Sequence, residues 1–140
     1  MSAPAVAVSP DGKKVAAAWM DERAGKKERK VFWAVSSSTA FTEDAPVDPS
    51  TRHIQNHPAL VIDESGTVWA AWEDDDRAGR QTIWIRSSAK GTKDGKAVQL
   101  SDAAQGNASF PALAAGGGVI GIVHEAGKRG EELAVFRRLK

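Results

Sequence analysis

The sequence predicts an all-β protein built from repeated, four-stranded antiparallel units. Three observations predict this fold class. Similar segments recur at a nearly constant spacing, apolar residues alternate with a period of two inside each segment, and glycine-containing tight-turn signals separate the alternating runs. The pattern shows no sustained 3.6-residue apolar stripe with helix caps, so we expect no helix longer than one turn.

The repeat is visible from three kinds of anchor. The Pro-Ala openings at Pro4, Pro58 and Pro111 are 54 and 53 residues apart. Trp19 and Trp72 are 53 residues apart, and Trp33 and Trp84 are 51 residues apart. Because these spacings agree within three residues, we interpret them as structurally equivalent positions of successive units.

Each unit contains the same succession of predicted strands. The second strand reads "KVAAAWM", "VWAAWED" and "VIGIVHE", and the third reads "KVFWAVSS", "TIWIRSS" and "LAVFRRL". Both alternating sets of the second strand are largely apolar, which indicates that both faces of the sheet are covered. Weaker fourth strands are expected at "APVD" and "AVQLSD", and Gly12 and Gly66 supply the positive φ of the first hairpins.

Four-stranded units of about 50 residues that are apolar on both faces are typical of β-propeller blades. We expect blades at residues 1–54 and 55–107 and an incomplete blade at 108–140. Three blades cannot close a ring, and exposed apolar end faces usually mark interfaces. We therefore expect a half-propeller that a homodimer completes, head to tail, to six blades.

The same residues resemble a known family. A proline that opens the inner strand, "DG" or "SG" in its turn, "AAW" in the second strand, an acidic-x-Arg-x-Gly loop and "SS" at the end of the third strand are similar to sialidase-like, Asp-box (bacterial neuraminidase repeat) propellers. In that family the serine leads into Ser-x-Asp-x-Gly-x-Thr-(Trp/Phe), from which "SSSTAFTED" and "SSAKGTKDG" depart. The resemblance covers essentially the whole chain and implies an extracellular or periplasmic location.

The resemblance also implies what an active sialidase would need: an arginine triad, a tyrosine nucleophile with a glutamate, and an aspartate acid. The chain has no tyrosine, and Arg23, Arg52 and Arg77 lie in no motif that matches the triad. A glycosidase with two carboxylates would draw on Glu73, Asp74 or Glu125, whose separation the sequence does not give. We therefore predict no catalytic residues.

Candidate ligand-binding residues lie where the connections between strands two and three meet the links between blades. In a four-stranded blade these segments emerge on one face, which suits a ligand site. Carboxylates beside guanidinium groups bind sugar hydroxyls or a carboxylate ligand. Because the acidic-Arg motif recurs, we prefer a structural role for it, within its own loop or between blades, over the ligand-binding role. The candidates are Asp21, Arg23, His53, Asn56, His57, Asp74, Arg77, Ser109, Phe110 and His124.

Composition limits the partners and cofactors. Nineteen basic and eighteen acidic residues leave a net charge of +1, which gives no electrostatic case for nucleic acid. No apolar run approaches the roughly 20 residues that span a bilayer, and the start "MSAPAVAVSPDGKK" has no signal-peptide pattern. Cysteine is absent, and nothing predicts that the three histidines converge on a metal, so we expect no cofactor.

Together these patterns predict a non-catalytic β-propeller binding or scaffold module, with carbohydrate as the ligand class, that assembles as a homo-oligomeric ring. Two alternatives stay open. One is a fragment or degenerate relative of a sialidase-like glycoside hydrolase. The other is an engineered or excised propeller fragment with no ligand of its own.

Overall fold

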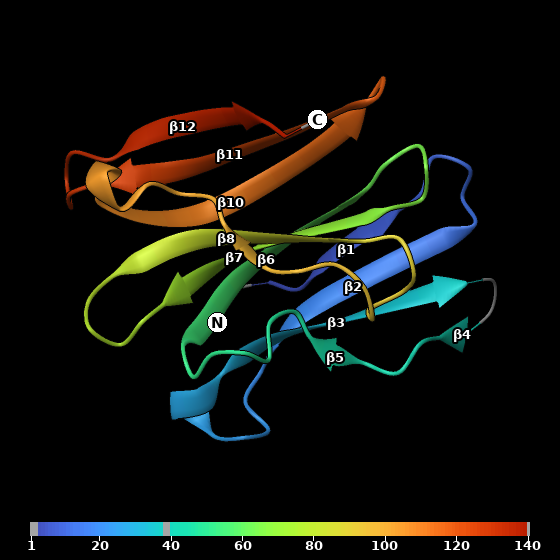
Figure 1. Ribbon diagram of the computed structural model, residues 1–140, viewed down its shortest axis with the longest axis horizontal. Helices are drawn as coiled ribbons and strands as arrows, with labels where there is room; N and C mark the ends of the chain where they lie inside the picture. Colours follow the sequence, from blue (N-terminus) through green and yellow to red (C-terminus); the bar gives the residue numbers. More distant parts are fainter. Residues whose placement is uncertain (1–2, 38–39, 140) are drawn as a thin grey trace.

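The structure, a computed structural model, describes residues 3–37 and 40–139 and consists of three antiparallel sheets (Figure 1). Sheet 1 comprises β1 (Ala5–Val8), β2 (Lys14–Asp21), β3 (Lys30–Ser37), β4 (Ala40–Phe41) and β5 (Ala45–Pro46). Sheet 2 comprises β6 (Ile54–Ile62), β7 (Val68–Asp75), β8 (Gln81–Ser88) and β9 (Val98–Gln99). Sheet 3 comprises β10 (Asn107–Gly116), β11 (Val119–Gly127) and β12 (Leu133–Arg138).

The strands follow the alternating pattern of the sequence. In each sheet the first three strands pair in chain order. The predicted fourth strands of sheets 1 and 2 appear as the short strands β5 and β9, which pair with β3 and β8. Within residues 3–37 and 40–139 the helical segments are two single 3-10 turns, η1 (Lys26–Glu28) and η2 (Ala103–Gln105). No helix among these residues is long and apolar enough to cross a membrane.

The sheets pack face to face, with sheet 2 between sheets 1 and 3 (Figure 1). Small alanines let the strands approach, and large side chains fill the space between them. The core between sheets 1 and 2 is the larger one, and it contains the fully buried Trp33 and Trp72. The core between sheets 2 and 3 is built around Ala71, Ile83 and Ile122. Apolar burial of this kind is the main stabilising contribution to the stack.

One predicted equivalence is wrong. The strand register pairs Trp72 with Trp84, whereas Trp19 pairs with Phe32. Phe32 is therefore the structural equivalent of Trp84, and Trp33 lies one residue further along the strand. Since neighbouring residues of a strand point to opposite faces, this single step places Trp33 toward sheet 2 and Trp84 toward sheet 1. The two tryptophans lie in the same core but come from opposite sides of it.

Aspartates close the predicted turns. In the hairpin between β6 and β7, Gly66 has the expected positive φ of 81°. Asp63 Oδ1 accepts from the backbone N–H groups of Ser65 at 2.9 Å and Thr67 at 3.0 Å, and Asp63 Oδ2 accepts from Trp69 Nε1 at 3.1 Å. The carboxylate thus satisfies turn amides that no strand partner reaches, as aspartate commonly does in turns.

Asp94 has the same function in the segment "SSAKGTKDG". Its carboxylate accepts from the Ser88 hydroxyl and from the backbone N–H groups of Ala89 and Lys90. These hydrogen bonds, the one from Ser88 foremost, lower the pKa of Asp94 from 3.8 to about 2. The next residue, Gly95, has φ 80° and lies directly against the carbonyl oxygen of Ser87. This turn therefore depends on both an ionised carboxylate and the absence of a side chain.

The depressed pKa of Asp94 predicts a specific acid sensitivity. Because the folded-state value lies below the unfolded one, the stabilisation is complete above about pH 4 and disappears as the pH falls toward 2. We expect Asp94→Asn to melt at a lower temperature than the parent protein at pH 6 and the two melting temperatures to converge near pH 2. Circular dichroism melts at these pH values measure this, with Glu64→Gln, at an exposed hairpin residue, as the control. Parallel curves for Asp94→Asn and the parent would contradict the assignment.

The outer faces of the stack are apolar and exposed. We call the surface formed by Val6, Val8, Val15, Ala17 and Trp19 the N-terminal face, and the surface formed by Ala112, Ala114, Gly121, Val123 and Phe136 the C-terminal face. Val6 is 69% exposed on the first face and Phe136 is 70% exposed on the second. Completion of a ring by a second copy, which would cover both faces, stays a prediction.

Candidate functional site

The inner strands of sheets 2 and 3 carry the same backbone irregularity. The register jumps between Asn56 and Ala59 in β6 and between Ser109 and Ala112 in β10. At each bulge the residue before proline has a positive φ, 49° at His57 and 52° at Phe110. This conformation is uncommon outside glycine, and bulges often redirect a side chain at a functional site.

The two redirected side chains meet. The rings of His57 and Phe110 lie with their centroids 4.6 Å apart and their planes tilted by 54°. Phe110 is 55% exposed, so it offers a ring surface to solvent, whereas the His57 side chain is about one-third exposed. An aromatic pair of this kind presents a flat apolar surface beside a polar nitrogen.

Glu73 lies beneath this pair and connects sheets 2 and 3. Its residue is only 3% exposed. The Oε2 atom lies 2.9 Å from Nδ1 of His57 and accepts a 3.3 Å hydrogen bond from the backbone N–H of Phe110. We call His57, Glu73 and Phe110 the Glu73 cluster. A buried carboxylate with two hydrogen-bond partners is a fixed acceptor rather than a mobile surface charge.

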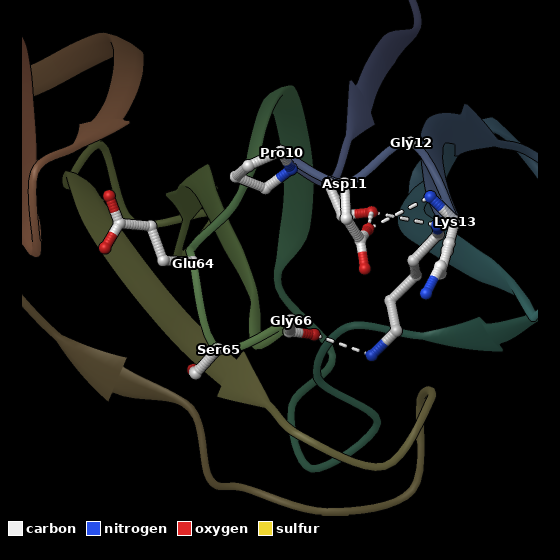
Figure 2. A pocket seen from close by; sticks show the side chains of 9 residues that line it. Pro10, Asp11, Gly12, Lys13, Glu64, Ser65 and Gly66 are labelled. Atoms are coloured by element: carbon white, nitrogen blue, oxygen red, sulfur yellow. Dashed lines mark hydrogen bonds between the residues drawn. The ribbon is translucent and has the colours of Figure 1, made fainter.

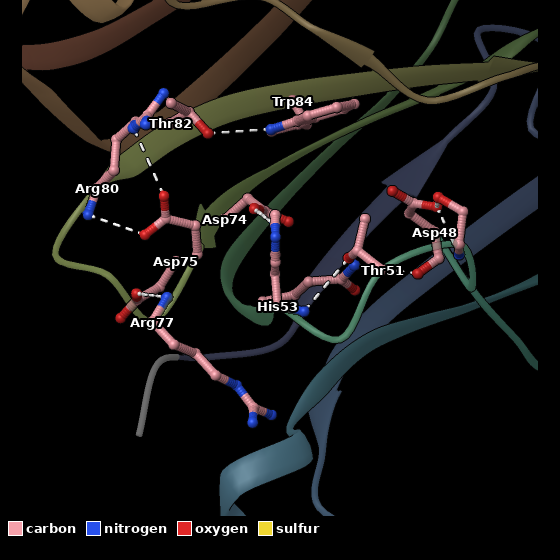
Figure 3. Close-up of polar contacts among 12 residues, drawn as sticks. Asp48, Thr51, His53, Asp74, Asp75, Arg77, Arg80, Thr82 and Trp84 are labelled. Carbon is pink, nitrogen blue, oxygen red and sulfur yellow. Dashed lines mark hydrogen bonds and ion pairs between the residues drawn. The ribbon is translucent and has the colours of Figure 1, made fainter.

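Asp74 belongs to a separate cluster between sheets 1 and 2, because successive residues of β7 point to opposite faces. Its Oδ1 lies 2.5 Å from Nδ1 of His53, and its Oδ2 is buried without a hydrogen-bond partner among the described residues (Figure 3). Lys30 Nζ donates to the backbone oxygens of Thr51 at 2.5 Å and His53 at 2.9 Å. Burial raises the pKa of Asp74 and lowers the pKa of Lys30.

The acidic-Arg loops support their own backbone. Asp21 Oδ1 accepts from the N–H of Arg23, and Asp75 Oδ1 accepts from the N–H of Arg77, both at 2.8 Å. The Arg23 guanidinium also binds Asp21, which lowers the pKa of that carboxyl to about 2, and it lies 4.2 Å from the centre of the Phe32 ring.

Arg77 instead extends away from sheet 2 and donates to the backbone oxygen of Lys27 in η1 (Figure 3). These contacts favour the structural interpretation of the motif: the carboxylate closes its loop, and the second arginine joins two neighbouring sheets. The guanidinium groups of Arg23 and Arg77 therefore already have partners within the protein.

The remaining candidate residues, Asn56, Ser109 and His124, differ in their burial and in their contacts. Asn56 is buried at 8% exposure and Ser109 is half-buried in β10. His124 is buried on β11, where its Nδ1 lies 3.0 Å from the Glu125 carbonyl and its Nε2 has no partner among the described residues. The three histidines do not come together, and within the described part of the chain no group of three or more potential ligands is arranged to hold a metal ion.

Glu73 is the residue that the candidate list missed. A signal was present in "VWAAWEDD", because Glu73 takes a position in the alternating set that Trp69 and Ala71 occupy earlier in the strand. A carboxylate in an otherwise apolar set indicates either an exposed strand end or a buried partner. The partners, a histidine and a backbone N–H from the next sheet, are separated in sequence by 16 and 37 residues.

The opposite end of the strands carries a groove between two hairpins (Figure 2). It is lined by residues 9–14 of sheet 1 and 64–66 of sheet 2. Lys14 Nζ spans the two hairpins and donates to the Gly66 carbonyl at 2.6 Å. The groove contains none of the candidate residues, so it is separate from the Glu73 cluster.

Comparisons with known proteins support the propeller fold. No protein-family profile matches the chain, and no curated protein matches it by sequence. Among solved structures, an endo-arabinase from Bacteroides thetaiotaomicron is similar with a TM-score of 0.64 and 11% identity, over 98% of this chain and 55% of that one. A Trypanosoma rangeli sialidase in complex with the inhibitor DANA is similar with a TM-score of 0.61 and 12% identity, over 97% of this chain and 27% of that one.

Both similar proteins are β-propeller glycosidases, so this chain has a sialidase-like propeller fold. At these identities the likeness establishes the fold alone. The chain spans about half of the endo-arabinase chain and about a quarter of the sialidase chain.

Proposed function

We propose that this protein is a non-catalytic β-propeller module that binds carbohydrate at the Glu73 cluster. The observation that carries the proposal is the contact of two redirected side chains above one buried carboxylate. The exposed Phe110 ring suits the apolar face of a sugar, and the part-exposed His57 imidazole, held by the buried Glu73, offers a polar nitrogen to its hydroxyls. Such a site combines a flat apolar surface with few fixed polar groups, as ligand sites usually do.

The module would work as part of a complete ring. The channel side of a propeller is formed by its inner strands, and in this chain the Glu73 cluster lies on the inner strands β6 and β10 together with β7. Three sheets supply half of a six-bladed ring, and a second copy supplies the other half in our proposal. The exposed apolar surface at both ends of the stack supports this arrangement.

We predict that Phe110→Ala weakens carbohydrate binding by at least about tenfold, which corresponds to about 1.4 kcal/mol. The probes are α-1,5-linked arabino-oligosaccharides and sialyllactose, screened on an array and then measured by calorimetry. Phe41→Ala is a matched control, because Phe41 is also 55% exposed but lies on β4. No binding by the parent protein to either probe, or an equal loss in both variants, would refute the proposed site.

Glu73 and Asp74 also support a second candidate function, that of a glycoside hydrolase related to the sialidase-like enzymes. Both carboxyls are buried, and burial raises the pKa of Asp74, a property useful in a general acid. Incubation with linear arabinan or a fluorogenic sialoside decides between the two. Product release that Glu73→Gln or Asp74→Asn abolishes would replace the binding proposal, whereas tight binding without product release supports it.

A further inference from the structure

The exposed N-terminal face repeats a surface that is buried elsewhere in the same molecule. Strand register makes Val6 equivalent to Leu60, Val8 to Ile62, Val15 to Val68, Ala17 to Ala70, and Trp19 to Trp72. All five residues of sheet 2 are buried against sheet 1. The same positions in sheet 1 therefore present a similar apolar surface, which no sheet of the described residues covers.

The C-terminal face is the matching half of such a contact. In sheet 2, Ala71 lies on the side that is buried against sheet 3. The register makes Val123 equivalent to Ala71, since each pairs with the alanine that follows the inner-strand proline. Phe136 pairs with Val123, and its ring lies over Gly121. Among the described residues, the C-terminal face thus corresponds to the side of sheet 2 that packs against sheet 3, and the N-terminal face corresponds to the side of sheet 2 that packs against sheet 1.

We propose that the C-terminal face of one copy packs against the N-terminal face of a second copy, and that this contact completes a second carboxylate site at Glu125. The inference rests on the proposed ring and names its partner and interface. It adds a site that one copy alone does not contain, because the backbone donor to Glu125 would come from the partner.

The equivalence of Glu125 and Glu73 follows from the bulges. Glu73 pairs with Asn56 and Glu125 pairs with Ser109, in each case two positions before the inner-strand proline. Glu73 is buried because sheet 3 covers it and donates the Phe110 N–H to it. Glu125 is exposed, because no sheet of the described residues covers that side of sheet 3. In the ring, the backbone N–H of Ala3 of the partner subunit takes the place of that donor.

The second site would differ from the first in one donor. Phe110 occupies the position of His57, so the imidazole that lies against Glu73 is replaced by a phenyl ring at Glu125. The Glu125 carboxylate therefore keeps more of its accepting capacity for a ligand hydroxyl. Glu125 is therefore the proposed hydroxyl acceptor, in contrast to Glu73, which has two partners.

An arginine connects the rims of sheets 1 and 2. Arg77 of sheet 2 crosses to the loop between the second and third strands of sheet 1, where it binds the Lys27 carbonyl. Arg23 makes the same loop contact as Arg77, since the backbone N–H of each donates to the aspartate two residues earlier, although the two loops are offset by one residue. In the ring, Arg23, which already binds Asp21 and Asp44, would lie beside the loop at residues 128–132 of the partner subunit. Lys128 and Arg129 offset Glu131 and Glu132 in that loop, so the orientation of the contact rests on the apolar faces and not on charge.

Sedimentation equilibrium tests the assembly. We expect the parent protein at micromolar concentration to have twice its monomer mass of 14.9 kDa. Val6→Lys, on the N-terminal face, is expected to shift the protein to monomers, because it would bury an unpaired charge. Val98→Lys is the matched control, since Val98 is 57% exposed but lies on the outer strand β9. A monomeric parent protein would overturn the proposal and would indicate that other blades cover these faces.

Carboxyl footprinting tests the Glu125 site. Carbodiimide coupling to glycine ethyl ester, read by mass spectrometry, is expected to modify Glu125 at least about tenfold less in the parent dimer than in Val6→Lys. Glu64, on an exposed hairpin away from both faces, should react equally in the two proteins. A dimer in which Glu125 stays reactive would overturn the interface. A parent protein that is monomeric and still binds sugar at the Glu73 cluster would refute this inference and leave the binding function intact.

Discussion

Replacing Trp33 with alanine is expected to lower the free energy of unfolding by about 3–5 kcal/mol, the range typical of large-to-small changes in protein cores. Trp33 is completely buried between sheets 1 and 2, where it packs with Trp72 and with the alanines of β2. The guanidinium group of Arg86 lies 5.1 Å from the centre of its ring. Alanine would leave a cavity that neighbouring strands, fixed by their hydrogen bonds, cannot fill.

Urea denaturation of Trp33→Ala, Trp33→Phe and Val98→Ala measures this effect. Trp33 Nε1 is buried without a hydrogen-bond partner among the described residues, so Trp33→Phe removes an unsatisfied donor along with part of the volume. We expect phenylalanine to cost less than half as much as alanine and the exposed Val98 change to cost under about 0.5 kcal/mol. Equal losses for alanine and phenylalanine would show that packing volume is not the cause.

Gly95→Ala is expected to destabilise the protein by about 3 kcal/mol or more, or to prevent folding. Gly95 has a φ of 80°, and a Cβ atom placed there would lie 1.8 Å from the carbonyl oxygen of Ser87. The contact is with the backbone of β8, so relief requires movement of a strand and not the rotation of a side chain. The Asp94 hydrogen bonds that close the same turn would be disturbed as well.

Gly12→Ala separates the two causes. Gly12 has a φ of 73°, close to that of Gly95, but a Cβ atom there meets nothing within 4 Å. Its substitution should therefore cost only the left-handed conformation, about 1–2 kcal/mol. Thermal melts of both variants give the comparison. If the two changes destabilised the protein equally, the steric clash at Gly95 would have no measurable effect.

The arrangement of strands could be read from the sequence because side-chain alternation and turn residues are local signals. The three inner and middle strands appear where the period-two pattern lies, and Gly12 and Gly66 occupy the predicted turns. The equivalence of Trp33 and Trp84 could not be read correctly, because a bulky apolar residue suits either side of a sheet that is covered on both faces. Only the register shows which side each one takes.

The candidate site was predictable only in part. His57, Phe110, His53 and Asp74 were named from their place in loops and strand ends, and the structure brings them together in two pairs. The contact between His57 and Phe110 depends on two bulges in which these residues have positive φ values. Neither residue type predicts this conformation by itself. Glu73 was considered only as a possible catalytic carboxylate and not as part of the binding site, because its two partners are the residues before Pro58 and Pro111, one of them in another sheet.

His57 and Phe110 have nearly the same backbone conformation, with φ values of 49° and 52°, although their side chains differ in chemistry. Both repeats keep the bulged backbone, while the residue before the proline differs between them. Sheet 2 presents an imidazole at this position and sheet 3 presents a phenyl ring. Exchanging these two residues should therefore alter which molecules are recognised. It should also lower the melting temperature, because phenylalanine at position 57 would remove the imidazole partner of the buried Glu73 carboxylate.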